Sequence, residues 1–146
     1  MIFKTIALAA DHAGYPVKEL IKKHFEGLGV RVKDYGTDSE ASTDYADYAH
    51  PMAAAVEQGE YEIGIAICGS GNGINMTVNK HQGIRAALCW NVEIAEMARL
   101  HNDANICTVP GRYVSHEEAI NIVDKFVNTS FEGGRHQKRI DKIPLK

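Results

Sequence analysis

The chain has 146 residues, of which 45% are hydrophobic and 24% charged, and its formal net charge is -3. This length suits one domain with a real core, and the balance of residue types is that of an ordinary globular protein. The acidic balance argues against nucleic acid or an anionic membrane as a partner. No apolar run approaches the roughly 18 residues of a membrane span.

Alternating polar and apolar segments predict an α/β fold. Short apolar runs with polar boundaries predict buried strands, and apolar residues at helical spacing predict helices between them. The expected strands cover residues 2–10, 30–35, 62–68, 84–89 and 105–109, and the expected helices cover 15–28, 48–56, 72–79, 94–100 and 116–127. This alternation indicates a Rossmann-like, doubly wound, five-stranded parallel sheet with helices on both faces.

Two local signals refine the expected helices. Ser115 is followed three residues later by Glu118, which is the pattern of a capping box at the start of the last long helix. Pro51 is expected in the first turn of the helix over 48–56, where proline is tolerated. After residue 130 the chain becomes a polar, basic tail.

The cysteines do not form a disulfide pattern. There are three, Cys68, Cys89 and Cys107, and none belongs to a CxxC pair. An odd, unpaired set favours a reducing cytoplasm. Asp11 and His12 follow the apolar start too early for a signal peptide, so that segment is expected to be a strand. The seven histidines show neither HxxxH nor HExxH, so no metal or cofactor is expected, although scattered histidines could converge in space.

The segment AICGSGNGI, residues 66–74, places Cys68 at the end of an expected strand and before a glycine loop. Its glycines do not match a dinucleotide fingerprint, and it contains no Walker lysine. No arginine stands six residues after Cys68, as a small tyrosine phosphatase would require. Glycines can turn successive N–H groups inward, which suits a phosphate or a reaction oxyanion. Cys68 is then a candidate base or nucleophile, and a small buried hydrophobic residue is the alternative.

For each of the other polar clusters, both a functional and a purely structural interpretation remain open. Asp11 and His12, and also Arg112, follow expected strands, where ligands bind in such sheets. His101 and Asn102 lie at the end of an expected helix. His101 could shuttle protons there, or both residues could simply terminate the helix. Arg135 and Arg139 are four residues apart and could hold phosphate from one helical face, or belong to a solvated tail. Either Tyr45 or Tyr48 could contact a substrate while the other packs in the core.

Taken together, these segments resemble a known family. ALAADHAG, TDYADYA, ICGSGNGI, NKHQGIRAA, RLHNDAN and EGGRHQKR occur in the order and spacing of the type B ribose-5-phosphate isomerases. That family also includes galactose-6-phosphate and allose-6-phosphate isomerases, and the resemblance covers nearly the whole chain. It implies a metal-free interconversion of ribose 5-phosphate and ribulose 5-phosphate in a homodimer, with a tetramer as the alternative. Sites would be shared between subunits, and the tail over 130–146 would pack at the interface.

The resemblance also implies roles for particular residues. Cys68 would move the proton between C1 and C2 through an enediol(ate), and the loop amides would hold the oxyanion. His101 would open the sugar ring, with Asp11 near the ring oxygen. The residues expected to bind substrate are His12, Tyr45, Gly69, Gly71, Asn72, Gly73, Asn102, Arg112, Arg135 and Arg139.

The glycine loop departs from the family pattern at two positions. Many members carry threonine where this chain has Ser70, which keeps the hydroxyl for a proton relay, and Asn72 replaces an apolar residue. Competing interpretations are an isomerase of a six-carbon sugar phosphate, a non-catalytic phosphosugar-binding module, and a cysteine hydrolase or redox protein.

Overall fold

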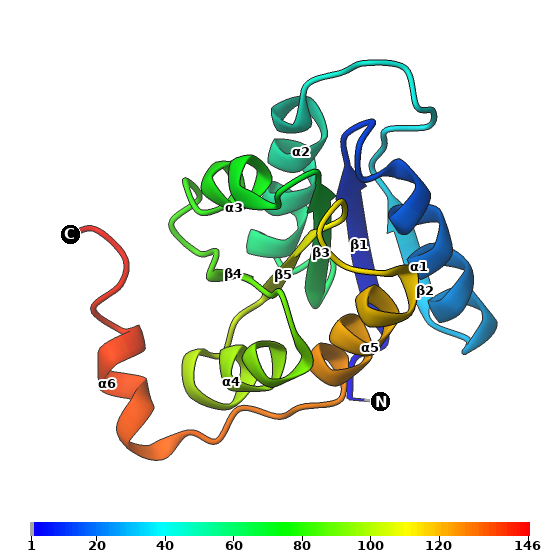
Figure 1. Ribbon diagram of the computed structural model, residues 1–146. Helices are drawn as coiled ribbons and strands as arrows, with labels where there is room; N and C mark the ends of the chain where they lie inside the picture. Colours follow the sequence, from blue (N-terminus) through cyan, green and yellow to red (C-terminus); the bar gives the residue numbers. More distant parts are fainter. Residues whose placement is uncertain (1) are drawn as a thin grey trace.

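The computed structural model describes residues 2–146. Strands and helices alternate along the chain up to the C-terminal segment (Figure 1). The elements are β1 Thr5–Ala10, α1 Tyr15–Gly27, β2 Arg31–Asp34, α2 Tyr45–Glu57, β3 Ile63–Cys68, α3 Asn72–Val78, β4 Ala86–Leu88, α4 Val92–Asn102, β5 Ile106–Pro110, α5 His116–Val127, the 3-10 turn η1 Gly134–His136, and α6 Gln137–Ile140.

The five strands form one sheet in the order β2-β1-β3-β5-β4, and every pairing is parallel. The predicted fold class is therefore confirmed. β3 and β5 are buried along their whole length, and β1 is buried from its second residue onward, because helices cover both faces of the sheet. The edge strands β2 and β4 are only partly buried.

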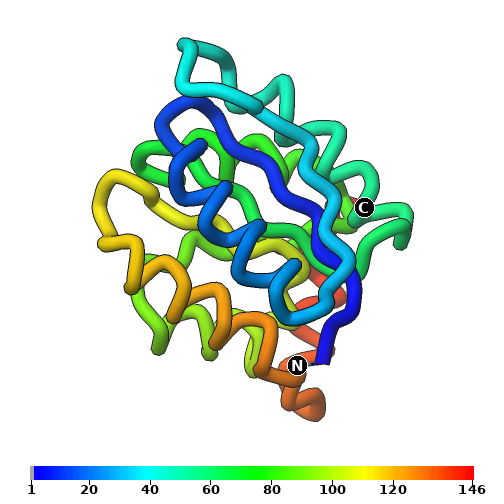
Figure 2. The backbone as a smooth tube through the Cα atoms, turned by 90° about the vertical axis from the view of Figure 1, so that its right-hand side faces the viewer, coloured from blue at the N-terminus to red at the C-terminus, as the bar shows by residue number. Residues whose placement is uncertain are grey.

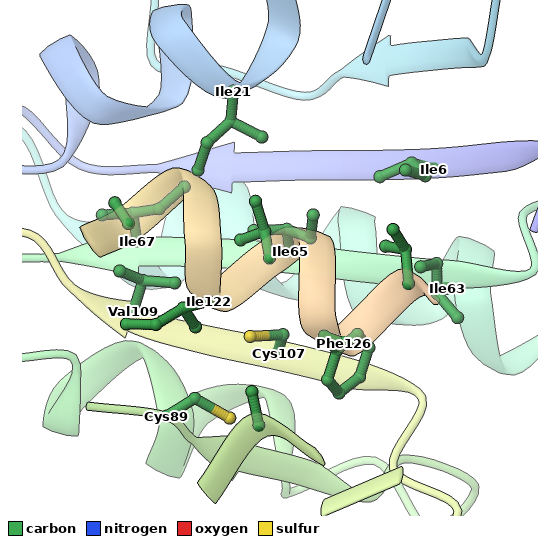
Figure 3. Close-up of a cluster of buried hydrophobic side chains, with 14 of the residues drawn as sticks. Ile6, Ile21, Ile63, Ile65, Ile67, Cys89, Cys107, Val109, Ile122 and Phe126 are labelled. Atoms are coloured by element: carbon green, nitrogen blue, oxygen red, sulfur yellow. The ribbon is translucent and has the colours of Figure 1, made fainter. Parts of the chain in front are cut away.

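Two layers of helices enclose the sheet. Helices α1, α4 and α5 pack on one face, and Figure 2 shows α1 and α5 side by side there. Helices α2 and α3 cover the other face. Figure 3 shows the first core, in which isoleucines of β1 and β3 meet the apolar side of α5. Cys89 and Cys107 are fully buried in that core, as expected of small hydrophobic residues.

The predicted capping box is present at the start of α5. The Ser115 hydroxyl accepts from the Glu118 N–H at 3.0 Å, and the Glu118 carboxylate accepts from the Ser115 N–H at 2.9 Å. These bonds satisfy two N–H groups that a helix start would otherwise leave without a partner. The hydrogen bonds to Ser115 also hold the pKa of the Glu118 carboxyl below its ordinary value.

The placement of Pro51 in a first turn was wrong. Helix α2 begins at Tyr45, so Pro51 lies inside the helix, in its second turn. The exposed first turn carries no apolar stripe, so periodicity could not reveal it, and Asp47 favours this turn through its charge near the helix N-terminus. The buried face formed by Ala49, Met52 and Ala53 holds the helix together despite the missing proline N–H.

The two ends of the parallel strands define two opposite edges of the sheet, which are distinct from the edge strands β2 and β4. Cys68 pairs with Pro110 where β3 and β5 end, whereas Gly64 pairs with Ile106 where they begin. Four residue-to-residue steps along each strand separate these edges, a span of roughly 13 Å. We refer to them as the carboxyl edge and the amino edge. Across residues 2–146, no helix is both long and apolar enough to cross a membrane.

Candidate active site

Cys68 is the last residue of β3 and lies at the carboxyl edge. It is 4% exposed and is a free thiol. Its carbonyl accepts the Gly111 N–H at 2.9 Å, and the Gly69 carbonyl accepts the Arg112 N–H at 3.0 Å. The segments that follow β3 and β5 are therefore joined, which fixes the backbone that carries the thiol.

The glycine loop after Cys68 presents unpaired backbone donors. Gly71 has a φ of 78°, a left-handed conformation that glycine adopts without strain. A Cβ on Gly71 would also lie 3.2 Å from the Pro110 nitrogen. Within residues 2–146, the N–H groups of Ser70, Gly71 and Gly73 have no acceptor. Backbone N–H groups that are free in this way can hold an anion when they converge on it.

Ser70 has a hydroxyl available for proton transfer. Its Oγ accepts the Asn72 N–H at 3.2 Å, and the side chain is exposed. The hydroxyl hydrogen therefore remains free to donate. Asn72 is the first residue of α3 and is exposed.

Two side chains from other elements border this loop. The Tyr45 ring lies against Gly73, where a Cβ would be 2.7 Å from the phenol oxygen. The Arg112 side chain lies against Gly69, where a Cβ would be 3.4 Å from Nη1. A phenol and a guanidinium thus stand beside the unpaired amides.

Asp11 and His12 reach the same edge from the loop after β1. Asp11 is 7% exposed, its N–H donates to the Ile67 carbonyl at 3.3 Å, and its Oδ1 accepts the Gly14 N–H at 3.0 Å. His12 is fixed by its Nδ1, which accepts the Thr43 N–H at 3.2 Å. That bond orients the ring and places Nε2 on its free side.

The structure distinguishes the two tyrosines that the sequence could not. Tyr48 packs against Gly36 and against the hydrophobic core between the sheet and helices α2 and α3. Its hydroxyl is 2.8 Å from that of Thr43. Tyr45 is 38% exposed. Tyr48 therefore supports the loop that holds His12, and Tyr45 is the more exposed of the two tyrosines.

The remaining candidates lie at the amino edge. His101 and Asn102 end α4, immediately before β5 begins, and Asn102 lines a cavity of about 270 Å³ with Arg85 and Ile143. Arg135 and Arg139 belong to η1 and α6. Figure 1 shows α6 beyond the end of α4 and far from the start of α3. One chain therefore does not bring these four residues to Cys68.

Two residues at the amino edge were missed by the sequence reasoning. Glu132 and His136 lie beside His101, and the His101 and His136 rings stack with centroids 4.4 Å apart. Their spacing of four residues could have placed Glu132 and His136 on one face of a turn. Nothing local in the sequence connects that turn to the end of α4.

The other two cysteines have no such setting. Hydrogen bonding with Cys89, together with burial, raises the pKa of the Cys107 thiol well above its ordinary value. Both residues are fully buried and face the core. Neither is therefore accessible to a substrate.

Comparisons with known proteins identify the family to which this chain belongs. The sequence model of the Ribose/Galactose Isomerase family matches residues 6–143. Ribose-5-phosphate isomerase B of Escherichia coli (strain K12) is 44% identical over 140 residues, covering 96% of this chain and 94% of that protein. A probable ribose-5-phosphate isomerase B of Mycoplasma pneumoniae is also 44% identical, over 139 residues that cover 94% of this chain and 91% of that protein.

Solved structures show the same fold. A ribose 5-phosphate isomerase from Thermotoga maritima superimposes with a TM-score of 0.94 at 46% identity, covering 96% of this chain and 97% of that one. Ribose-5-phosphate isomerase B from Mycoplasma genitalium, with bound ribulose-5-phosphate, gives a TM-score of 0.92 at 41% identity. It covers 95% of this chain and 93% of that one.

Proposed function

Since this chain belongs to the ribose/galactose isomerase family, we propose that it interconverts ribose 5-phosphate and ribulose 5-phosphate. The relative from Mycoplasma genitalium with bound ribulose-5-phosphate supports this choice of substrate. The observation that carries the proposal is the Cys68 thiol at a strand end, next to three unpaired N–H groups of the glycine loop. An aldose–ketose isomerase needs this combination of a base and an oxyanion cradle.

The proton transfer follows from this arrangement. The Cys68 thiolate removes the proton from C2 of the open-chain aldose, and the electrons of that bond form the C1–C2 double bond. The carbonyl oxygen on C1 then becomes the enediolate oxygen, which the N–H groups of the loop stabilise. The Cys68 thiol then returns its proton to C1, while the C2 hydroxyl loses its proton and the C1 oxygen gains one, which completes the ketose. Ser70 moves the proton between the two oxygens.

The other groups at the carboxyl edge bind and orient the sugar. One Asp11 oxygen is held by Gly14, which leaves the second for the ring oxygen or a hydroxyl. Tyr45 contacts a hydroxyl, and Asn72 shapes the loop beside it. His12 and Arg112 contribute to phosphate binding. Holding the remote phosphate orients the reacting carbons.

A second copy of the chain supplies the rest of the site. His101, which opens the ring, lies at the amino edge with the sugar contact Asn102 and the phosphate-binding residues Arg135 and Arg139. We place these side chains opposite the partner's Cys68 in a two-fold homodimer, in which each site draws on both chains. Exposed apolar side chains near the loop, Met76 at 65% and Trp90 at 54%, support an interface there. A tetramer of such dimers is the alternative.

We assign the whole chain to one isomerase domain, with the tail over 130–146 at the interface. The reaction as proposed uses no metal or cofactor. The free thiols of all three cysteines fit a reducing cytoplasm.

The test is turnover of ribose 5-phosphate in the presence of a chelator. We expect the native chain to be active and Cys68→Ala to lose about 10²- to 10⁴-fold in kcat, the usual contribution of a general base. Cys89→Ala is the matched control, because that cysteine is buried in the core, and it should keep its turnover.

Each competing function predicts a different result. Full activity in Cys68→Ala would remove the thiol from the mechanism. An inactive native chain that turns over allose 6-phosphate or galactose 6-phosphate would identify a six-carbon isomerase. Tight binding without turnover of any of these sugars would identify a binding module, and a covalent adduct on Cys68 would favour a hydrolase.

A further inference from the structure

Three side chains with metal-binding atoms meet at the amino edge. They are His101 at the end of α4, Glu132 in the segment after α5, and His136 at the end of η1. One ligating atom of each lies within 4.8 Å of the others. In the part of the chain that the structure describes, this is the one such cluster of three.

The backbone around this cluster is firmly held. The Glu132 N–H donates to the Leu100 carbonyl at 3.0 Å, which joins the C-terminal segment to the end of α4. The buried Arg99 side chain donates to the Thr129 carbonyl at 3.0 Å and to the Ala104 carbonyl at 2.7 Å. These bonds fix the positions from which the three side chains extend.

One atom of the cluster lacks a partner. His136 is 8% exposed, and its Nε2 is buried without a hydrogen bond to residues 2–146. The nearest carboxylate oxygen, Oε2 of Glu132, is 3.7 Å away, which is too far for a hydrogen bond. Buried polar atoms are nearly always satisfied, so this nitrogen is available to bind a ligand outside residues 2–146.

The donor set indicates what that ligand is. Two imidazoles and one carboxylate are typical of Zn²⁺ and similar divalent metals, and three protein ligands leave a fourth position open. Glu132 Oε2 lies 3.8 Å from Nε2 of His101 and 3.7 Å from Nε2 of His136. Tetrahedral zinc places ligand atoms about 3.4 Å apart, so a movement of a few tenths of an ångström brings this carboxylate oxygen into range of both nitrogens.

The side chains that must move are free to do so. The side chains of His101 and Glu132 are 40% and 45% exposed, whereas that of His136 is 9% exposed. His101 must turn out of its stack on His136, in which the rings are inclined by 18°. Arg135 lies 3.6 Å from the other Glu132 oxygen, so it can remain paired while Oε2 binds the ion.

We propose that His101, Glu132 and His136 form a binding site for Zn²⁺ or a related late first-row divalent cation, and that this ion inhibits the isomerase. Coordination would use the lone pair that His101 needs to open the sugar ring. The inhibition rests on the proposed function of His101, whereas the binding does not.

Direct titration of the chelator-treated, dialysed protein with Zn²⁺ tests the binding. We expect about one ion per chain in calorimetry, consistent with a single three-ligand site. His136→Asn and Glu132→Gln should weaken binding by more than about 10- to 100-fold, the contribution of outer-shell partners alone. His116→Asn, at an exposed position on α5, is the matched control and should bind as the native chain does. Glu132→Gln changes an exposed side chain, so it keeps the test valid if His136→Asn fails to fold.

Co²⁺ and turnover provide independent readouts. Bound Co²⁺ should lack the thiolate charge-transfer band that ligation by Cys68 would produce. Zn²⁺ should inhibit the native chain reversibly, with activity restored by chelator, and should leave the turnover of Glu132→Gln and His136→Asn much less affected. Absence of Zn²⁺ binding, equal binding by both variants, or a thiolate band would overturn the proposal. Zn²⁺ binding by a chain without isomerase activity would support the site and count against the proposed function alone.

Discussion

The phenol ring of Tyr45 occupies the space that a side chain on Gly73 would require. A Cβ at Gly73 would lie 2.7 Å from the Tyr45 oxygen and 2.8 Å from its Cε2. Tyr45 begins α2 and Gly73 lies in the first turn of α3, so this contact joins the two helices at the carboxyl edge. The absence of a side chain at Gly73 thus determines where the tyrosine stands relative to the loop.

Gly73→Ala should therefore displace Tyr45 and weaken substrate binding. We expect KM for ribose 5-phosphate to rise about fivefold, as for loss of a hydrogen bond worth about 1 kcal/mol, with a smaller effect on kcat. Tyr45→Phe removes only the hydroxyl and should reproduce most of this change. Gly27→Ala is the control, since a Cβ there meets nothing within 4 Å. An unchanged KM in both Gly73→Ala and Tyr45→Phe would remove Tyr45 from the substrate site.

Mixed dimers test whether the active site is shared. Cys68→Ala and His101→Ala should each be inactive alone, because every site in either homodimer lacks one residue. When the two chains are co-expressed with different tags, random pairing should restore about a quarter of native activity, since half the dimers then contain one intact site. The measurement is turnover of the doubly purified heterodimer, which should have about half of native activity because one of its two sites is intact. If that heterodimer is inactive, Cys68 and His101 do not act across an interface.

Alkylation should distinguish the three cysteines. Cys68 is 4% exposed, whereas Cys89 and Cys107 are fully buried. Hydrogen bonding with Cys89 and burial also keep the pKa of Cys107 well above its ordinary value, so it has almost no thiolate near neutral pH. We expect iodoacetamide to label Cys68 first, and turnover to be lost at the same rate. Ribose 5-phosphate should slow both the labelling of Cys68 and the loss of turnover. Peptide mass spectrometry reads out the site, and earlier labelling of Cys89 or Cys107 would contradict this assignment.

A buried lysine makes Asp34 important for stability. Lys18 is fully buried, and its ammonium group donates to Asp34 and also to Glu19 at 2.9 Å. Asp34→Asn leaves most of that charge uncompensated, so we expect a loss of about 3 kcal/mol in the free energy of unfolding. Glu19→Gln, at a more exposed position, should cost less than about 1 kcal/mol. Urea denaturation measures the free energy of unfolding of both variants. Equal losses would contradict the inference that Asp34 is the main partner of the Lys18 ammonium group.

The effect of Asp34 should depend on pH. Burial opposes its ionisation, but hydrogen bonds from Lys18, the Gly36 N–H and Lys22 outweigh burial and lower the pKa of the carboxyl. The hydrogen bond to Asp34 in turn raises the pKa of Lys22 to about 12. A lowered carboxyl pKa stabilises the fold above the unfolded value near about 3.9, and this stabilisation is lost as the pH falls through the folded value. The difference between native and Asp34→Asn should therefore shrink in acid, and a constant difference would refute this account.

Short-range patterns in the sequence determined much of this protein. Residues within a few positions of one another specify the buried runs of β1, β3 and β5 and the capping box of Ser115 and Glu118. They also specify the thiol of Cys68 directly before a glycine loop. Strand ends that carry polar residues meet at one edge of a parallel sheet, so the order of elements along the chain is enough to group Asp11, Cys68 and Arg112. The start of α2 is not encoded in this way, because its exposed first turn has no apolar stripe.

Tertiary structure alone decided the contacts between distant segments. It placed β5 between β3 and β4, chose Tyr45 over Tyr48 as the accessible tyrosine, and separated His101 from Cys68 by the length of the sheet. It also returned the C-terminal segment to the end of α4, where Glu132 and His136 join His101. The periodicity of a sequence reports which face of an element is buried, but which elements then meet depends on how the whole chain packs.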